Sequence, residues 1–325
     1  MEKSFDAKLR RIVADSSCRD FILADAKDGD MGLGLAAPGK SFSAATGDQA
    51  FRTLASYRQA MRDITRQGLV DIMLMSVSTG EQLALVEGLF GATQVTPAVR
   101  ANDTSDIWCG DSASYKHEPS LAFATTTPQQ ARCGGKVDLA LYSITFNNDA
   151  RIDREALERY RQFRHEAEQA GLRHFLEVFS PNAPVRPIED VPRYVNDCIV
   201  RCVAGVAAAG RPLFLKMPYY GPRAMSALVH YDPSLVVGIL GGSSGTTHDA
   251  FRMLWEAKKY GARAALFGRK INGAEHQLTF VKTLRAVADD QLDPAEAVRR
   301  YHGELALLKI PPHRSLEDDL KLTQV

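Results

Sequence analysis

The sequence has no long run of apolar residues and no strong excess of charge of either sign. No stretch reaches the roughly 18 uninterrupted apolar residues that a membrane-spanning helix needs, and the N-terminus alternates charges where a signal peptide would have an apolar core. Lysine and arginine number 40 against 39 aspartates and glutamates, for a formal net charge of +1. We therefore expect a cytoplasmic protein with no membrane span and no nucleic-acid surface, whose partner is a small molecule.

Cysteine and histidine are too few and too scattered to form a recognisable framework. The five cysteines are odd in number, which fits reduced thiols better than disulfides. Cys198 and Cys202 share a helix face without a further ligand at metal spacing nearby, and the eight histidines form no convincing metal-ligand set. We predict neither a metal site nor a cofactor.

Linkers, internal repeats and low-complexity runs are absent as well. Hydrophobic residues make up 45% of the 325 residues and charged residues 24%, the balance of a chain that buries a sizeable core. We predict one domain over residues 1–325, with an elaborated loop at about 101–135 and a C-terminal helical extension in which Ser315 caps a short helix. The loop would cover the site or mediate a subunit contact.

Short apolar, β-branched runs alternate with longer amphipathic stretches along most of the chain. The runs predict eight strands, at 21–25, 70–77, 94–100, 137–146, 174–180, 212–218, 235–242 and 264–270. Helices are expected at 48–67, 81–90, 152–170, 189–209, 221–230, 246–260 and 274–289, with Gly68, Gly171, Gly210 and Gly261 where four of them stop. This order favours a (β/α)8 TIM barrel of the α/β class over a doubly wound open sheet.

Two charged residues are expected inside the barrel, near the carboxyl ends of neighbouring strands. Side chains alternate along a strand, so Lys216 shares the inward face of Phe214, and Glu177 shares that of Phe175. Desolvation favours the neutral amine of a lysine, which is the form that attacks a carbonyl. The two residues predict a nucleophilic lysine with a proton-shuttling carboxylate, and a buried ion pair without chemistry is the alternative.

Glycines near the ends of the last two strands predict a phosphate site. The run GGSSG supplies Gly241, Gly242 and Ser243, and Thr246 or Thr247 is placed to cap the helix that follows. Gly268 and Arg269 end the eighth strand. In a TIM barrel the loops after strands seven and eight commonly bind phosphate, and Arg269 would supply the charge.

The first and third strands add weaker candidates for the rim of the site. Asp25 is the best placed for a ligand contact, with Lys27 and Asp28 following it in the loop. The aspartates lack the downstream glutamate that a calcium loop needs, so a metal site is not expected. Arg100 ends the third strand and would reach a second anionic group or form a rim salt bridge.

With these residues the sequence resembles the class I (Schiff-base) aldolase superfamily, nearest the tagatose-1,6-bisphosphate aldolase and sulfofructose-phosphate aldolase branch. The resemblance is carried by the motifs FILADAKDG, LEVFS with Glu177, FLKMP with Lys216, GGSSG and FGRK. The resemblance spans most of the chain in order and spacing. It implies a Schiff base on Lys216, proton transfer by Glu177, Asp25 near substrate hydroxyls, and phosphate held by Gly242, Ser243 and Arg269, without a metal. That branch commonly has another lysine on strand four, whereas VDLALYSITF has none.

We therefore expect a lyase that cleaves or forms a carbon–carbon bond in a phosphorylated ketose. Two other functions stay open: a non-catalytic barrel that binds sugar phosphates, and a lyase or isomerase that uses Lys216 as a general base without an imine. A homo-oligomer is expected by family analogy.

Overall fold

The computed structural model describes residues 2–15, 17–40, 51–103, 110–242 and 245–323. Eight parallel strands pair in sequence order, and the last pairs with the first, so the sheet closes into a barrel. The strands are β1 (Ile22–Lys27), β2 (Ile72–Met75), β3 (Thr96–Arg100), β4 (Leu139–Thr145), β5 (Arg173–Phe179), β6 (Leu215–Met217), β7 (Val237–Leu240) and β8 (Ala264–Phe267). The predicted (β/α)8 barrel is confirmed, and the open-sheet alternative is wrong.

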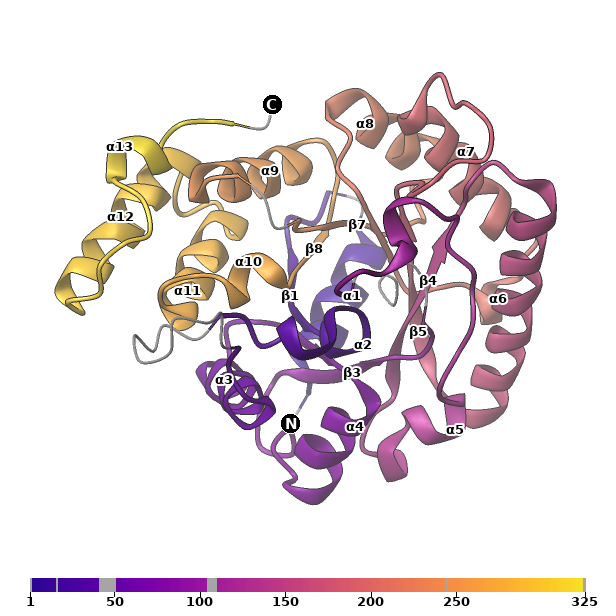
Figure 1. Cartoon of the computed structure of the whole chain (residues 1–325), viewed down its shortest axis with the longest axis horizontal. Coiled ribbons are helices and arrows are strands. Elements are labelled where there is room, and N and C mark those ends of the chain that lie inside the picture. The colour runs from indigo at the N-terminus through magenta and orange to yellow at the C-terminus, as the bar shows by residue number, and fades with distance from the viewer. Residues whose placement is uncertain (1, 16, 41–50, 104–109, 243–244, 324–325) are drawn as a thin grey trace.

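Helices surround the barrel in the expected order (Figure 1). The larger ones are α3 (Leu54–Gln67), α6 (Ala150–Ala170), α7 (Val191–Ala204), α8 (Pro222–Tyr231), α9 (Thr247–Lys259), α11 (Gln277–Ala288) and α12 (Pro294–Leu307). Short helices are α2 (Asp30–Leu33), α5 (Pro128–Ala131), α10 (Arg269–Asn272) and α13 (Leu316–Asp319). α13 begins after Ser315, whose side chain accepts a hydrogen bond from the Asp318 amide, as the sequence predicts.

The observed helices differ from the prediction at several places. The helix expected at 81–90 is α4 (Val77–Gly80) continued by a π-helix (Glu81–Val86), so it starts where β2 was expected to continue. α7 ends at Ala204 with Gly205 as its C-cap, and Gly210 instead ends a separate 3-10 turn. α1 (Ser4–Ala14) and α12 were not predicted.

Apolar side chains fill the amino-terminal half of the barrel interior. Ile22, Leu74, Leu141, Phe175 and Phe214 belong to this cluster, and the rings of Phe175 and Phe214 stack with their centroids 4.4 Å apart. α1 closes this end from outside with Phe5, Leu9 and Ile12. The amino-terminal end is therefore packed shut, and only the carboxyl-terminal half of the interior has room for polar side chains.

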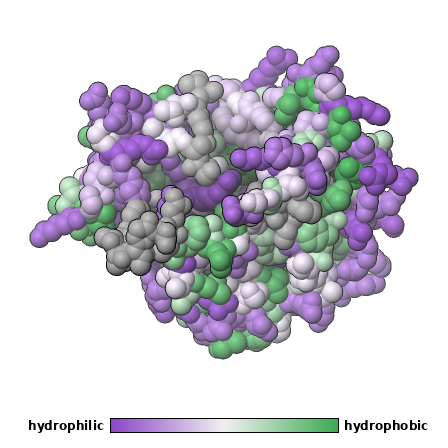
Figure 2. All heavy atoms as spheres, viewed as in Figure 1, coloured by the Kyte–Doolittle hydropathy of each residue, from purple (hydrophilic) through white to green (hydrophobic). Residues whose placement is uncertain are grey.

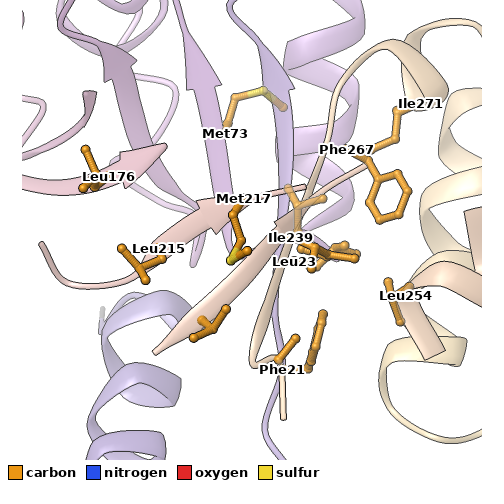
Figure 3. Close-up of a cluster of buried hydrophobic side chains, with 14 of the residues drawn as sticks. Phe21, Leu23, Met73, Leu176, Leu215, Met217, Ile239, Leu254, Phe267 and Ile271 are labelled. Atoms are coloured by element: carbon orange, nitrogen blue, oxygen red, sulfur yellow. The ribbon is translucent and has the colours of Figure 1, made fainter. Parts of the chain in front are cut away.

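A second, larger core lies between the outer face of the strands and the helices. Leu23, Leu176, Leu215 and Ile239 point outward from their strands toward this layer, where Leu254 of α9 and Ile271 of α10 also lie (Figure 3). Residues of one strand thus alternate between two cores, as the period of a strand requires. This alternation decides which charged residues face the barrel interior.

The surface seen from the same side as Figure 1 is mostly hydrophilic at its periphery, with hydrophobic side chains gathered in the lower middle, over the region of α2 and α4 (Figure 2). Exposed apolar residues of this region include Leu35, Leu85 and Val86. Across the described ranges, none of the helices combines the length and the apolar composition that a bilayer crossing requires.

Candidate active site

Lys216 and Glu177 meet inside the barrel, as predicted. The two residues are register partners in the β5–β6 pair, and each follows a phenylalanine of the interior core by two positions. The Lys216 Nζ atom lies 2.5 Å from Glu177 Oε1. Lys216 is 5% exposed and Glu177 is 1% exposed. The Glu177 carboxylate therefore holds the Lys216 amino group at the edge of the apolar core that is nearer the carboxyl ends of the strands.

Arg100 completes this buried group from β3. Its Nη2 atom lies 3.2 Å from Glu177 Oε2, and Nη1 donates to Ser143 Oγ at 2.8 Å. Ser143 in turn donates to Glu177 Oε2 at 2.8 Å, and Asn102 fixes Ser143 through hydrogen bonds to its backbone N–H and C=O. Arg100 is 3% exposed, so its guanidinium lies within the barrel and is not part of a rim salt bridge.

Asp28, expected only as a loop residue after Asp25, is the second carboxylate of the site. Its Oδ2 atom accepts a hydrogen bond from Arg100 Nε at 2.6 Å. Burial alone would raise the pKa of Asp28, but the charges of Arg100 and Lys216 and the hydrogen bond from Arg100 outweigh burial and hold this pKa below its usual value. Arg100 and Lys216 therefore lie beside two carboxylates, those of Asp28 and Glu177.

Asp25 and Lys27, which were expected at the rim, lie on the other side of the barrel wall. Ile22 and Ala24 point into the barrel, so Asp25 and Lys27 point outward with Leu23. Lys27 Nζ lies 3.0 Å from Asp25 Oδ2 and 6.0 Å from the centre of the Tyr57 ring of α3. Both residues are 0% exposed and neither lines the cavity described below, so the structure places Asp25 and Lys27 away from the rim where they were expected.

A cavity opens above the buried group at the carboxyl ends of the strands. Asp28, Arg100, Glu177 and Lys216 form one part of its wall. Gly241, Gly242, Gly268 and Arg269, predicted as a phosphate site, form another part. The sequence elements expected to bind phosphate and those expected to perform chemistry therefore share one cavity. Ser243 lies outside the described residues.

Gly268 lies close against the backbone of β1. A Cβ atom there would collide with the backbone carbonyl oxygen of Ala26 in β1. The lack of a side chain lets β8 turn sharply into α10, so that Arg269 follows at the cavity wall. Arg269 is exposed, and its charge is available to a ligand at the mouth of the cavity.

The start of α9 is capped by the protein itself. The Thr246 side chain accepts from the Asp249 amide, which confirms Thr246 as the cap, and the Asp249 side chain accepts from the Thr246 amide. The Thr247 amide donates to Asp319 Oδ1 at 2.7 Å. These amides are therefore occupied, as is that of Gly241, which donates to the Leu266 carbonyl, so an anion in the cavity is left to the backbone of Gly242 and Gly268 and to Arg269.

Two residues of the site could have been found by extending the alternation of side chains further. Ile22, Ala24 and Ala26 face inward, so Asp28 follows on the same face, but the predicted strand stopped at residue 25. Leu139 and Leu141 face inward in the same way and are followed by Ser143.

In the described part of the chain, no group of three or more histidine, cysteine, aspartate or glutamate side chains is arranged to hold a metal ion.

Comparisons with known proteins find similarity in structure and none in sequence. No family model matches the sequence, and no curated protein matches it either. A fructose-bisphosphate aldolase from Slackia heliotrinireducens DSM 20476 superposes with a TM-score of 0.66 at 16% identity, covering 91% of this chain and 89% of that chain.

Two further solved structures align over nearly their whole length. A Schiff-base-forming fructose-1,6-bisphosphate aldolase gives a TM-score of 0.63 at 15% identity, covering 87% of this chain and 99% of that chain. An archaeal fructose 1,6-bisphosphate aldolase gives 0.62 at 14% identity, covering 86% and 98%. At these identities the similarity establishes the barrel fold alone.

Proposed function

We propose that this protein is a class I aldolase, a lyase that cleaves or forms a carbon–carbon bond in a phosphorylated ketose through a Schiff base on Lys216 and needs no metal. The observation that carries the proposal is the 2.5 Å contact between Lys216 Nζ and Glu177 Oε1 at the floor of a cavity. The same cavity contains the glycines and the arginine suited to a phosphate group. The aldolases of the same fold make this chemistry the first to test.

The first step makes the lysine a nucleophile. Glu177 accepts a proton from the ammonium group of Lys216, and the neutral amine attacks the ketose carbonyl carbon C2. Glu177 then returns the proton to the hydroxyl group of the carbinolamine, which leaves as water and gives an iminium ion. Arg100 and Ser143 both contact Glu177 Oε2, so they hold the carboxylate with Oε1 facing Lys216.

The second step breaks the bond between C3 and C4. A base removes the proton of the C4 hydroxyl group, the aldehyde leaves, and the bonding electron pair moves into the iminium ion to give an enamine. Asp28 takes this role in place of Asp25, because it lines the cavity and its lowered pKa keeps it ionised. Protonation at C3 and attack by water then release the ketone phosphate and restore the lysine.

The phosphate group would lie along the part of the cavity wall that the glycines and Arg269 form. The backbone of Gly241, Gly242 and Gly268 lets an anion approach closely, and Arg269 supplies a guanidinium group at the mouth. Ser243 stays a predicted phosphate contact on the sequence alone. Strand four presents Ser143 to the site and has no lysine, although a lysine on this strand is common in the resembled branch, so the sugar that this site selects is left open.

The proposal is tested by incubating the protein with dihydroxyacetone phosphate and sodium borohydride and measuring the intact mass. Borohydride reduces an imine to a stable adduct, so we expect the mass to rise by one reduced molecule of the ketone phosphate per chain. The Lys216→Arg variant keeps the positive charge but cannot form the imine, so it should stay unmodified under the same conditions.

Other outcomes separate the remaining functions. An unmodified protein that still binds the ketone phosphate would support the binding barrel, and one that turns over substrate in borohydride would support a general-base lyase or isomerase. An adduct with pyruvate alone would keep the Schiff base and replace the phosphorylated ketose as the donor.

A further inference from the structure

The segment from Ser315 to Thr323, which we call the C-terminal segment, packs against the start of α9. In Figure 1, α12 and α13 lie beside α9, and the chain then runs back along α9. The hydrogen bonds between the segment and α9 join residues 72–75 positions apart in the sequence: Thr246 Oγ1 donates to the Lys321 carbonyl, and His248 Nδ1 lies 2.7 Å from the Leu320 carbonyl oxygen. The segment is therefore fixed to the residues that follow the seventh strand.

Asp319 anchors this segment below the surface. It is 2% exposed, and its Oδ1 atom accepts the hydrogen bond from the Thr247 amide. Its Oδ2 atom lies 3.0 Å from His302 Nε2 of α12. Burial would raise the pKa of Asp319, but the hydrogen bonds from Thr247 and His302 outweigh burial and lower it, so the carboxylate stays charged at the start of α9.

Asp249 connects the segment to the glycines of the proposed phosphate site. Its Oδ2 atom accepts hydrogen bonds from the Thr246 amide at 2.7 Å and from Thr323 Oγ1 at 2.6 Å, and Oδ1 accepts from the Thr323 amide. The same carboxylate lies against Gly245, where an added Cβ atom would collide with it. Gly245 has a φ of 82°, so its conformation also favours glycine.

The glycines are held from two further directions. Leu322 of the segment lines a cavity together with Gly241 and Gly242, on the side of α9 and the β6–α8 loop. From α10, Lys270 Nζ donates to the Gly245 carbonyl oxygen at 2.9 Å. The described glycines of the β7–α9 connection therefore lie between the active-site cavity, α10 and the C-terminal segment.

We propose that the C-terminal segment is a positioning element that holds Gly241, Gly242 and Gly245 in place for the phosphate group of the substrate. This inference rests on the proposed function for the identity of the ligand. None of the segment's residues lines the active-site cavity, so it acts through the glycines. Backbone amides bind an anion well only when they are already oriented, because ordering them on binding costs free energy. Loss of the segment therefore weakens recognition of the phosphate group and spares the chemistry at Lys216.

The test compares Asp319→Ala with Glu317→Ala in the full chain. Glu317 is an exposed acidic residue of the same short helix, so its variant controls for loss of a charge in α13. Trapping with borohydride is measured against the concentration of dihydroxyacetone phosphate and, separately, of dihydroxyacetone. Trapping by dihydroxyacetone also reports whether Lys216 is still in a folded site. Thr323→Val removes only one hydroxyl group and serves as a milder variant.

We expect the half-saturating concentration of dihydroxyacetone phosphate to rise about tenfold in Asp319→Ala, about 1.4 kcal/mol. The half-saturating concentration of dihydroxyacetone should change less than twofold in Asp319→Ala. Both concentrations should be the same in Glu317→Ala as in the wild-type protein. Amide hydrogen exchange over residues 238–249, which needs no substrate, should accelerate in Asp319→Ala, less strongly in Thr323→Val, and not in Glu317→Ala.

Unchanged exchange in both Asp319→Ala and Thr323→Val would overturn the inference, as would an equal loss for both ketones. If the wild-type protein forms no adduct, the proposed function is contradicted instead. The positioning role would then be decided by amide hydrogen exchange alone.

Discussion

The barrel wall separates two buried pairs of a lysine and a carboxylate that look alike in composition. Lys216 and Glu177 lie inside the barrel with nitrogen and oxygen 2.5 Å apart. Lys27 and Asp25 lie outside it at 3.0 Å, between β1 and α3. Within the described ranges, the first pair lines the active-site cavity and is joined to a second cation, Arg100, and a second carboxylate, Asp28, whereas neither residue of the second pair lines that cavity.

This difference shows that burial of a lysine does not by itself indicate chemistry. Burial lowers the pKa of Lys27 and raises the pKa of Asp25, and in each case it outweighs the attraction between the two. A perturbed lysine is thus present where no substrate can reach it. Lys216 and Glu177 have their proposed role because they line the cavity and because neighbouring side chains keep Glu177 oriented.

We call Lys216 with Glu177 the inner pair and Lys27 with Asp25 the outer pair. The largest effect on activity should follow from replacing Lys216, the lysine of the inner pair. Lys216→Met should lower turnover at least about a thousandfold, about 4 kcal/mol of transition-state stabilisation, because no other group in the cavity can form the imine. Steady-state assays of the cleavage reaction measure this loss. Lys27→Met is the matched control and should keep most of the turnover per folded molecule; equal losses in the two variants would remove the distinction.

The outer pair should instead matter for stability. Lys27→Met leaves Asp25 buried without its partner and should lower the free energy of unfolding by about 3 kcal/mol, measured by urea denaturation.

The loss in Lys27→Met should depend on pH. Because burial raises the pKa of Asp25 in the folded state, the folded state binds the proton more tightly than the unfolded state does. Stability is then retained at low pH and lost as pH rises through the folded pKa. The loss should therefore be larger at pH 8 than at pH 5, and the reverse trend would contradict the account.

Asp28→Asn should have an intermediate effect on catalysis. It keeps the size of the side chain but removes the base, so kcat should fall about a hundredfold while Lys216 is still trapped by borohydride. Asp30→Asn is the control: Asp30 accepts a hydrogen bond from Ser76 and does not line the cavity. A normal kcat in Asp28→Asn would assign the base elsewhere.

The smallest effect is expected when the outer pair is removed as a unit. Asp25→Leu combined with Lys27→Met replaces two buried charges with apolar side chains, and its stability should lie within about 1 kcal/mol of the unmodified protein. Thermal denaturation checks this. A double variant less stable than Lys27→Met would show that the pair contributes more than mutual neutralisation.

The strands and the inner pair could be predicted because they depend on a local pattern. Eight apolar runs separated by amphipathic stretches indicate the barrel, and a period of two places Lys216 behind Phe214 and Glu177 behind Phe175. The error at Asp25 has the same origin. The expected strand ended too early to show that Asp25 and Lys27 face the helices and Asp28 faces the cavity.

Contacts between distant parts of the chain could not be predicted in this way. Ser315 is recognisable as a helix cap, but the hydrogen bond between Asp319 and Thr247 depends on how α12 and α13 pack on α9. Arg100 likewise contacts Asp28, Ser143 and Glu177, which lie far from it in the sequence. A single sequence does not contain these distances.

The most direct test of the central claim is to find which lysine carries the adduct. The protein is incubated with dihydroxyacetone phosphate and sodium borohydride, digested, and mapped by mass spectrometry. The account predicts modification of the peptide that contains Lys216, with the peptides of Lys27 and Lys270 unmodified. Modification at Lys27 or Lys270, or a fully folded protein with no modification at Lys216, would contradict it.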